Sequence, residues 1–125
     1  MFKKVILVAE DDIPNQTVMK AFLENKYKVI LANDGVELFI ILKNAKQLPD
    51  LILLDIRMPN KNGYQVLMEM CEHPQWQQIP VIIVTGEDDV RHLTEHYCQI
   101  EKIHHKPVHF PLLLNDIEKI LKHKN

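Results

Sequence analysis

The chain has 125 residues, of which 46% are hydrophobic, and its formal net charge is −2. This length and apolar content suit one folded domain with its own core and argue against disorder. Because acidic and basic residues are spread along the chain, neither a basic surface for nucleic acid nor a polybasic membrane-binding segment is predicted. The first apolar run, residues 5–9, is too short for a signal peptide or a membrane span, so we expect a cytoplasmic protein.

Short apolar runs alternate with segments of helical periodicity. Strands are predicted at residues 5–9, 27–31, 51–54 and 80–84, and a weaker one at 100–105. Helices are predicted at five places: from 12 to 25, from the turn at 33–35 to about 45, at 64–71, from the acidic segment 87–89 onward, and around 113–121. Residues 73–78 are predicted to form a loop, in which Trp76 covers the edge of the core. Strict alternation of this kind predicts an α/β fold whose parallel strands are joined by right-handed crossovers. The run 51–54 is the most hydrophobic and should be the central strand, and 27–31 should lie nearer an edge.

Polar residues follow four of the predicted strands at the point where each strand ends. Glu10, Asp11 and Asp12 follow the first strand, Asp55 the third, Thr85 and Gly86 the fourth, and Lys106 the fifth. Parallel sheets bind ligands at the carboxyl ends of their strands, so these groups should share one rim. Crowded carboxylates repel each other unless a cation neutralises them, and a hard ion such as Mg²⁺ prefers oxygen ligands. An aspartate beside such an ion can attack phosphorus, while the ion and a lysine balance the charge on the transferred phosphoryl group.

The same residues resemble the signature of two-component response-regulator receiver domains. The resemblance is carried in order by Val8-Ala9-Glu10-Asp11, Leu54-Asp55-Ile56-Arg57-Met58-Pro59, Gly63, Val84-Thr85-Gly86 and Lys106-Pro107. It extends over essentially the whole chain, so we expect residues 1–125 to form a single receiver domain similar to the chemotaxis regulators. The segment 10–16 looks most like receivers of hybrid sensor kinases. The resemblance implies a flavodoxin-like, doubly wound five-stranded parallel sheet of order 2-1-3-4-5, with helices on both faces.

The resemblance also implies which residues hold a metal ion. That ion would be Mg²⁺, and Mn²⁺ could replace it. Asp55 would be the phosphoacceptor and a metal ligand. Asp11 would bind the ion directly, and Glu10 would bind it through a water molecule. The backbone carbonyl of Arg57 would complete the protein ligands.

A second group of residues would act on the phosphoryl group itself. By the same resemblance, Lys106 pairs with the phosphoryl oxygens, and the Lys106–Pro107 peptide bond is cis. The Thr85 hydroxyl and the Gly86 backbone N–H contact the phosphoryl group after transfer. Arg57 and Glu87, two places after Asp55 and Thr85, are expected to modulate hydrolysis by approaching each other over the phosphorylated site.

One departure from the family pattern concerns the switch position. The residue three places before the lysine is usually aromatic in this family, and its rotamer reports on the threonine. Here it is Ile103, so the aromatic readout is absent, whereas the predicted phosphorylation site is intact.

The implied function is that of a phosphorylation-controlled signalling module rather than an enzyme in the usual sense. A histidine kinase or phosphotransfer protein would donate the phosphoryl group from a phosphohistidine, and the chain would then dock to a downstream protein or relay the group. One alternative is a degenerate receiver that acts only through protein interactions. A phosphatase of the haloacid-dehalogenase type would need an aspartate two residues after the nucleophile, where this chain has Arg57, and no glycine-rich loop predicts nucleotide binding.

Overall fold

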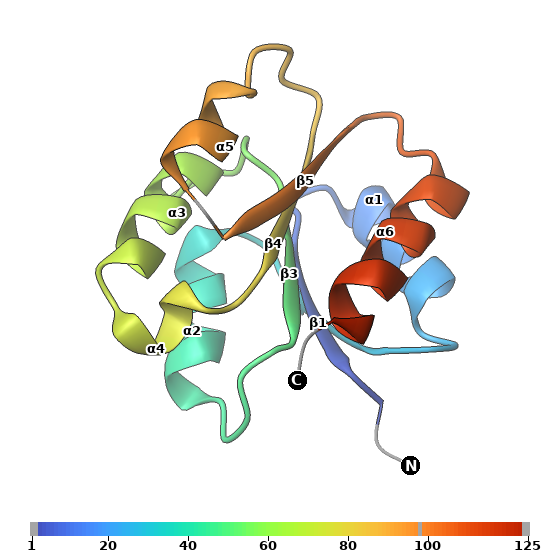
Figure 1. The fold of residues 1–125 in the computed structure, drawn as a ribbon, viewed down its shortest axis with the longest axis horizontal. Helices are drawn as coiled ribbons and strands as arrows, with labels where there is room; N and C mark the ends of the chain where they lie inside the picture. The colour runs from blue at the N-terminus through green and yellow to red at the C-terminus, as the bar shows by residue number, and fades with distance from the viewer. Residues whose placement is uncertain (1–2, 98, 124–125) are drawn as a thin grey trace.

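The computed structural model describes residues 3–97 and 99–123 and contains one five-stranded parallel sheet (Figure 1). Its strands are β1 (Val5–Ala9), β2 (Lys28–Ala32), β3 (Leu51–Leu54), β4 (Val81–Thr85) and β5 (Ile100–His105). They are arranged in the order β2-β1-β3-β4-β5. The central place of β3, the edge place of β2 and the implied strand order are therefore confirmed.

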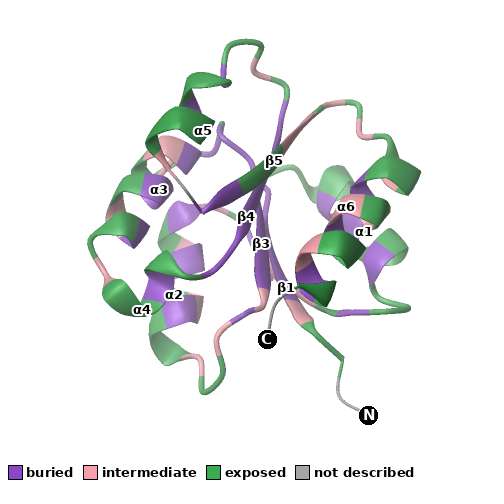
Figure 2. Cartoon of the chain, in the orientation of Figure 1, coloured by how far each residue is buried: buried purple, intermediate pink, exposed green. Residues whose placement is uncertain are grey.

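Helices cover both faces of this sheet. Helices α1 (Ile13–Leu23) and α6 (Phe110–Lys122) lie on one side, and α2 (Gly35–Asn44), α3 (Gly63–Cys71), α4 (Pro74–Gln77) and α5 (His92–His96) lie on the other (Figure 1). The three inner strands, β1, β3 and β4, are almost entirely buried, whereas the edge strands β2 and β5 are partly exposed (Figure 2). Each layer closes a separate cluster of apolar side chains against its own face of the sheet.

Two helices differ from the sequence-based expectation. The helix predicted to begin at the acidic segment 87–89 begins only at His92. Glu87 is instead held at the rim, with its N–H donating to Thr85 Oγ1 at 3.1 Å and its carboxylate accepting from Arg57. The predicted loop 73–78 contains the short helix α4. Trp76 lies on it and is buried against Phe39, with ring centroids 5.3 Å apart, so its role in covering the core is confirmed.

The start of α1 follows the predicted capping pattern. Asp12 caps the helix by accepting a hydrogen bond from the backbone N–H of Asn15 at 2.9 Å, and Pro14 lies in the first turn. An aspartate in this position satisfies a backbone donor that the helix leaves free. The cap turns the chain sharply after β1, so residues 10 and 11 stay at the rim of the sheet.

The loop that follows β3 folds back closely on the end of that strand. The N–H of Gly63 donates to the carbonyl of Ile56 at 2.8 Å. A methyl group on Gly63 would lie 2.6 Å from the carbonyl oxygen of Asp55 and 2.8 Å from the Cα of Ile56. Both are backbone atoms, so glycine is required here by close approach rather than by an unusual φ.

Among the described residues, no helix combines the length and the apolar character needed to cross a membrane.

Replacing Gly63 with alanine should therefore lower stability by about 1–3 kcal/mol, because the added methyl group has to displace the backbone at the end of β3. Gly86→Ala is the matched control, since a Cβ there would meet no atom within 4 Å, and its stability should stay within about 0.5 kcal/mol of wild type. Urea unfolding of both variants measures the difference. Equal stability of Gly63→Ala and Gly86→Ala would contradict the predicted crowding.

Candidate functional site

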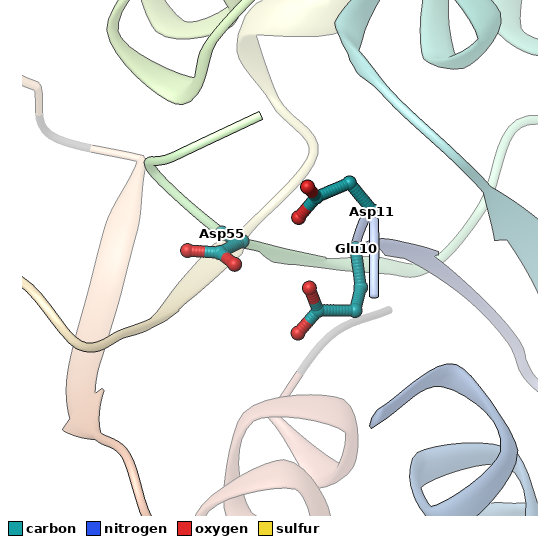
Figure 3. A group of neighbouring side chains, drawn as sticks. All are labelled: Glu10, Asp11 and Asp55. Atoms are coloured by element: carbon teal, nitrogen blue, oxygen red, sulfur yellow. The ribbon is translucent and has the colours of Figure 1, made fainter. Parts of the chain in front are cut away.

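Three carboxylates lie together at the carboxyl ends of β1 and β3. One oxygen each of Glu10, Asp11 and Asp55 lies within 4.8 Å of the others. In Figure 3, Glu10 and Asp11 turn their carboxylates toward the side on which Asp55 lies. Glu10 and Asp55 are only 5% and 6% exposed, whereas Asp11 is open to solvent. The structure thus brings together the three acids that the sequence analysis placed at the ends of two strands.

Backbone hydrogen bonds hold two of these acids at the rim. The N–H of Glu10 donates to the carbonyl of Ala32 at 3.0 Å, and the N–H of Asp55 donates to the carbonyl of Ala9 at 3.1 Å. Both bonds continue the parallel ladders one residue beyond the strands. The positions of the two carboxylates are therefore set by the sheet itself.

This cluster has the ligand chemistry of a site for a hard cation. All of its donors are oxygens, and ligand oxygens on opposite sides of a magnesium ion lie roughly 4 Å apart. The oxygens of the three acids lie within 4.8 Å of one another, so small side-chain movements would bring them to the spacing that one ion requires. Such an ion would also relieve the repulsion between carboxylates that the sheet forces together.

Lys106, at the end of β5, reaches into the same cluster. Its Nζ donates to Asp55 Oδ2 at 2.8 Å and to Glu10 Oε1 at 2.6 Å. Its backbone N–H donates to the carbonyl of Thr85 at 2.8 Å, which ties the lysine to the end of β4. The Lys106–Pro107 peptide bond is cis, as the family resemblance suggested.

The proton affinities of this group follow from burial and pairing. Burial raises the pKa of Glu10 above its ordinary value, even though the hydrogen bond from Lys106 opposes the shift. For Lys106, burial lowers the pKa, but the hydrogen bonds to Asp55 and Glu10 outweigh that effect, and the pKa is raised overall. The lysine is therefore held in its charged form between two buried carboxyl groups.

Thr85 and Gly86 reach the same rim on β4, which lies beside β3 in the sheet. Thr85 is fully buried, and its hydroxyl oxygen accepts the hydrogen bond from Glu87 described above. Gly86 is exposed, with open space around it. Ile103 on β5 pairs in register with Ile83 and is half-buried against the cluster under α2–α5.

Arg57 and Glu87 meet at this rim. Arg57 Nε donates to Glu87 Oε1 at 2.5 Å, and the two side chains are 80% and 26% exposed. The hydrogen bond to Glu87 raises the pKa of Arg57, so the guanidinium stays charged. The backbone N–H of Arg57 also donates to Asp55 Oδ1 at 3.3 Å, so the same residue contacts the phosphoacceptor candidate.

Gln16 is a site residue that the motifs did not single out. It lies on α1, is 6% exposed, and its Nε2 donates to the backbone carbonyl of Glu10 at 2.5 Å. Its spacing with Met19 and Leu23 places it in the buried stripe of the helix. A glutamine inside an otherwise apolar stripe needs a buried partner, and that pattern was the available signal.

Comparison with known proteins points in one direction. The chain matches the response regulator receiver domain family over residues 6–118. It is 33% identical to the response regulator Rcp1 of Synechocystis sp. over 98 residues, which cover 70% of this chain and 67% of that protein. It spans 21% to 67% of the length of the first three curated relatives that it matches.

Two solved structures share the fold closely. The phosphorylated cyanobacterial phytochrome response regulator RcpA is 25% identical, with a TM-score of 0.80 over 97% of this chain and 95% of that one. The receiver domain of the sensor histidine kinase PA1611 from Pseudomonas aeruginosa PAO1, with a magnesium ion coordinated in its active-site cleft, is 26% identical. Its TM-score is 0.81, over 96% of this chain and 98% of that one.

The family match extends over most of the chain. It includes Lys106 and all three acids of the cluster, which are Glu10, Asp11 and Asp55. The observed strand order is the one implied by the receiver resemblance. This chain therefore belongs to the response regulator receiver domain family, whose members are signalling modules rather than conventional enzymes.

Proposed function

We propose that this receiver accepts a phosphoryl group on Asp55 from the phosphohistidine of a histidine kinase or phosphotransfer protein, in a reaction that requires Mg²⁺, with Mn²⁺ as a substitute. The observation that carries the proposal is the contact of the buried Asp55 carboxylate with Lys106, beside two further acids that the sheet holds in place. The magnesium-bound PA1611 receiver and the phosphorylated RcpA support it by similarity.

A carboxylate oxygen of Asp55 forms the new P–O bond while the P–N bond of the phosphohistidine breaks, and the electron pair of that bond stays with the imidazole nitrogen. Mg²⁺, held by Asp11, Asp55, the Arg57 carbonyl and, through water, Glu10, would supply positive charge beside the phosphoryl oxygens.

The remaining residues act on the oxygens of the transferred group. The Lys106 ammonium, already 2.8 Å from Asp55 Oδ2, would turn from the carboxylate to a phosphoryl oxygen. The Thr85 hydroxyl and the Gly86 N–H would donate to the same group after transfer. Because Ile103 replaces the usual aromatic residue, the phosphorylated state would be communicated without the rotation of an aromatic ring at this position.

The proposal extends to the whole chain as one receiver domain. The described strands form a single sheet with a cluster of three acids at its rim, and among the described residues no other group of three or more histidines, cysteines or acids is arranged to hold a metal ion. Phosphorylation would then control docking to a downstream protein, or onward transfer of the phosphoryl group.

Incubation with Mg²⁺ and a small-molecule phosphodonor should add one phosphoryl group to the wild-type protein and none to Asp55→Asn. The reason is that the amide removes the nucleophilic oxygen while keeping the shape of the side chain. Intact mass spectrometry with and without a chelator measures both requirements. Equal phosphorylation of Asp55→Asn, or of wild type without divalent ions, would overturn the proposal, and a wild type that never gains the group would favour a receiver that only binds partners.

The Arg57–Glu87 pair should prolong the life of the phosphorylated state. If the pair stays closed over the phosphoryl group, it restricts the water that attacks in line opposite Asp55. An exposed pair contributes only about 0–1 kcal/mol, so single replacements should speed dephosphorylation by no more than about fivefold and hardly change stability.

The measurement is the dephosphorylation rate of Arg57→Ala, Glu87→Ala and the double variant. We expect faster hydrolysis in each single variant and a smaller than additive change in the double, because the second replacement acts on a pair already broken. Unchanged or slower hydrolysis in both single variants would disprove the gate.

A further inference from the structure

The turn from β2 into the first residue of α2, residues 33–35, lies outside the acidic cluster but is linked to one side of it through Gln16. Asn33 Oδ1 accepts a hydrogen bond from Gln16 Nε2 at 2.6 Å. The same nitrogen donates to the backbone carbonyl of Glu10. Because the amide has two N–H groups, both are used, and Gln16 is fixed between the turn and the end of β1. The main chain of Glu10 and Asp11 is therefore held from the side of the turn.

The next two residues of the turn hold the loop on the other side of the cluster. Asp34 Oδ2 accepts from Asn60 Nδ2 at 2.7 Å, and the N–H of Gly35 donates to the carbonyl of Lys61 at 3.0 Å. Asn60 and Lys61 belong to the loop that begins at Asp55 and carries Arg57. A methyl group on Gly35 would lie 2.5 Å from the Lys61 oxygen, so the loop packs directly on the turn.

The turn is itself anchored to α2. Asp34 Oδ1 accepts from the N–H of Glu37 at 2.8 Å, and the Glu37 carboxylate accepts from the N–H of Asn33 at 2.9 Å. These reciprocal contacts fix the turn on the first turn of the helix. The turn can therefore act as a rigid support rather than follow the two segments that it contacts.

We propose that residues 33–35 are a positioning turn, which sets the spacing between the Glu10–Asp11 side and the Asp55–Arg57 side of the metal and phosphoryl cleft. The inference rests on the proposed function, because it concerns the geometry of that cleft. Mg²⁺ demands near-ideal octahedral geometry, so a small change in the spacing of its ligands weakens binding. None of the three residues is a proposed ligand, and each acts through Gln16, Asn60 or Lys61.

Two variants remove one link each while leaving the proposed ligands unchanged. Asn60→Gly deletes the side chain that bonds Asp34 and suits the backbone, because Asn60 is exposed and has a φ of 67°. Gln16→Met keeps the length and burial of the side chain but removes its amide. Asn44→Ala is the matched control, since this exposed asparagine only bonds the Ile40 carbonyl in the last turn of α2.

The readouts are the Mg²⁺ dissociation constant from calorimetry and the melting temperature without Mg²⁺. Loss of a contact that orients a metal ligand weakens binding by about tenfold or more, so we expect that change in Asn60→Gly and in Gln16→Met and none in Asn44→Ala. Exchanging the partners, as Asp34→Asn with Asn60→Asp, reverses donor and acceptor at constant charge and should restore affinity toward the wild-type value.

Unchanged Mg²⁺ affinity in Asn60→Gly, with only a lower melting temperature, would overturn the inference and leave the contact a purely structural one. If Gln16→Met does not fold, the Mg²⁺ affinity of Asn60→Gly still tests the inference, because Asn60 is exposed and its replacement should not unfold the protein. A wild-type protein that binds no Mg²⁺ would instead overturn the proposed function and this inference together. Wild-type binding with unaffected variants overturns the inference alone.

Discussion

The two buried carboxylates of Glu10 and Asp55 share a single ammonium group, that of Lys106. The contacts of 2.6 Å and 2.8 Å bring three strand ends to one point, since Glu10 follows β1, Asp55 follows β3 and Lys106 follows β5. Two nearly buried acids beside a third leave more negative charge than one lysine can balance. The site is therefore organised around a deficit of positive charge, and a divalent ion and a phosphoryl-transfer reaction both fit that deficit.

The sheet maintains this unfavourable grouping of charges. Parallel strands end at the same edge, and the ladder bonds from Glu10 and Asp55 continue past the strand ends. Burial of the apolar clusters on the two faces stabilises the fold and offsets the repulsion between the grouped carboxylates. Contacts from the neighbouring helices, those of Gln16 on α1 and of Gly63 at the start of α3, add to the positioning of the strand ends that carry the acids.

Much of this arrangement could be predicted from sequence because it depends on local patterns. Buried strands appear as continuous apolar runs, and the polar residue that ends each run marks the rim, which located Glu10 and Asp55. The fifth strand is not such a run, and Lys106 was identified there by the Lys106-Pro107 motif at its end. The late start of α5 could not be read in this way. The acids at 87–89 look like a helix start, but Thr85 and Arg57 bind Glu87 from outside the segment. The packing of Trp76 on α4 against Phe39 and the bond from Gln16 to Asn33 likewise depend on partners distant in sequence.

The most direct test of the charge deficit is Mg²⁺ binding by Lys106→Met, a variant that keeps most of the side-chain stem but removes the ammonium. Because the lysine occupies both carboxylates without being a proposed metal ligand, Mg²⁺ should bind the variant at least as tightly as wild type, while phosphorylation by a small phosphodonor should become much slower. Loss of Mg²⁺ binding in a folded Lys106→Met protein, or phosphorylation at the wild-type rate, would contradict the account.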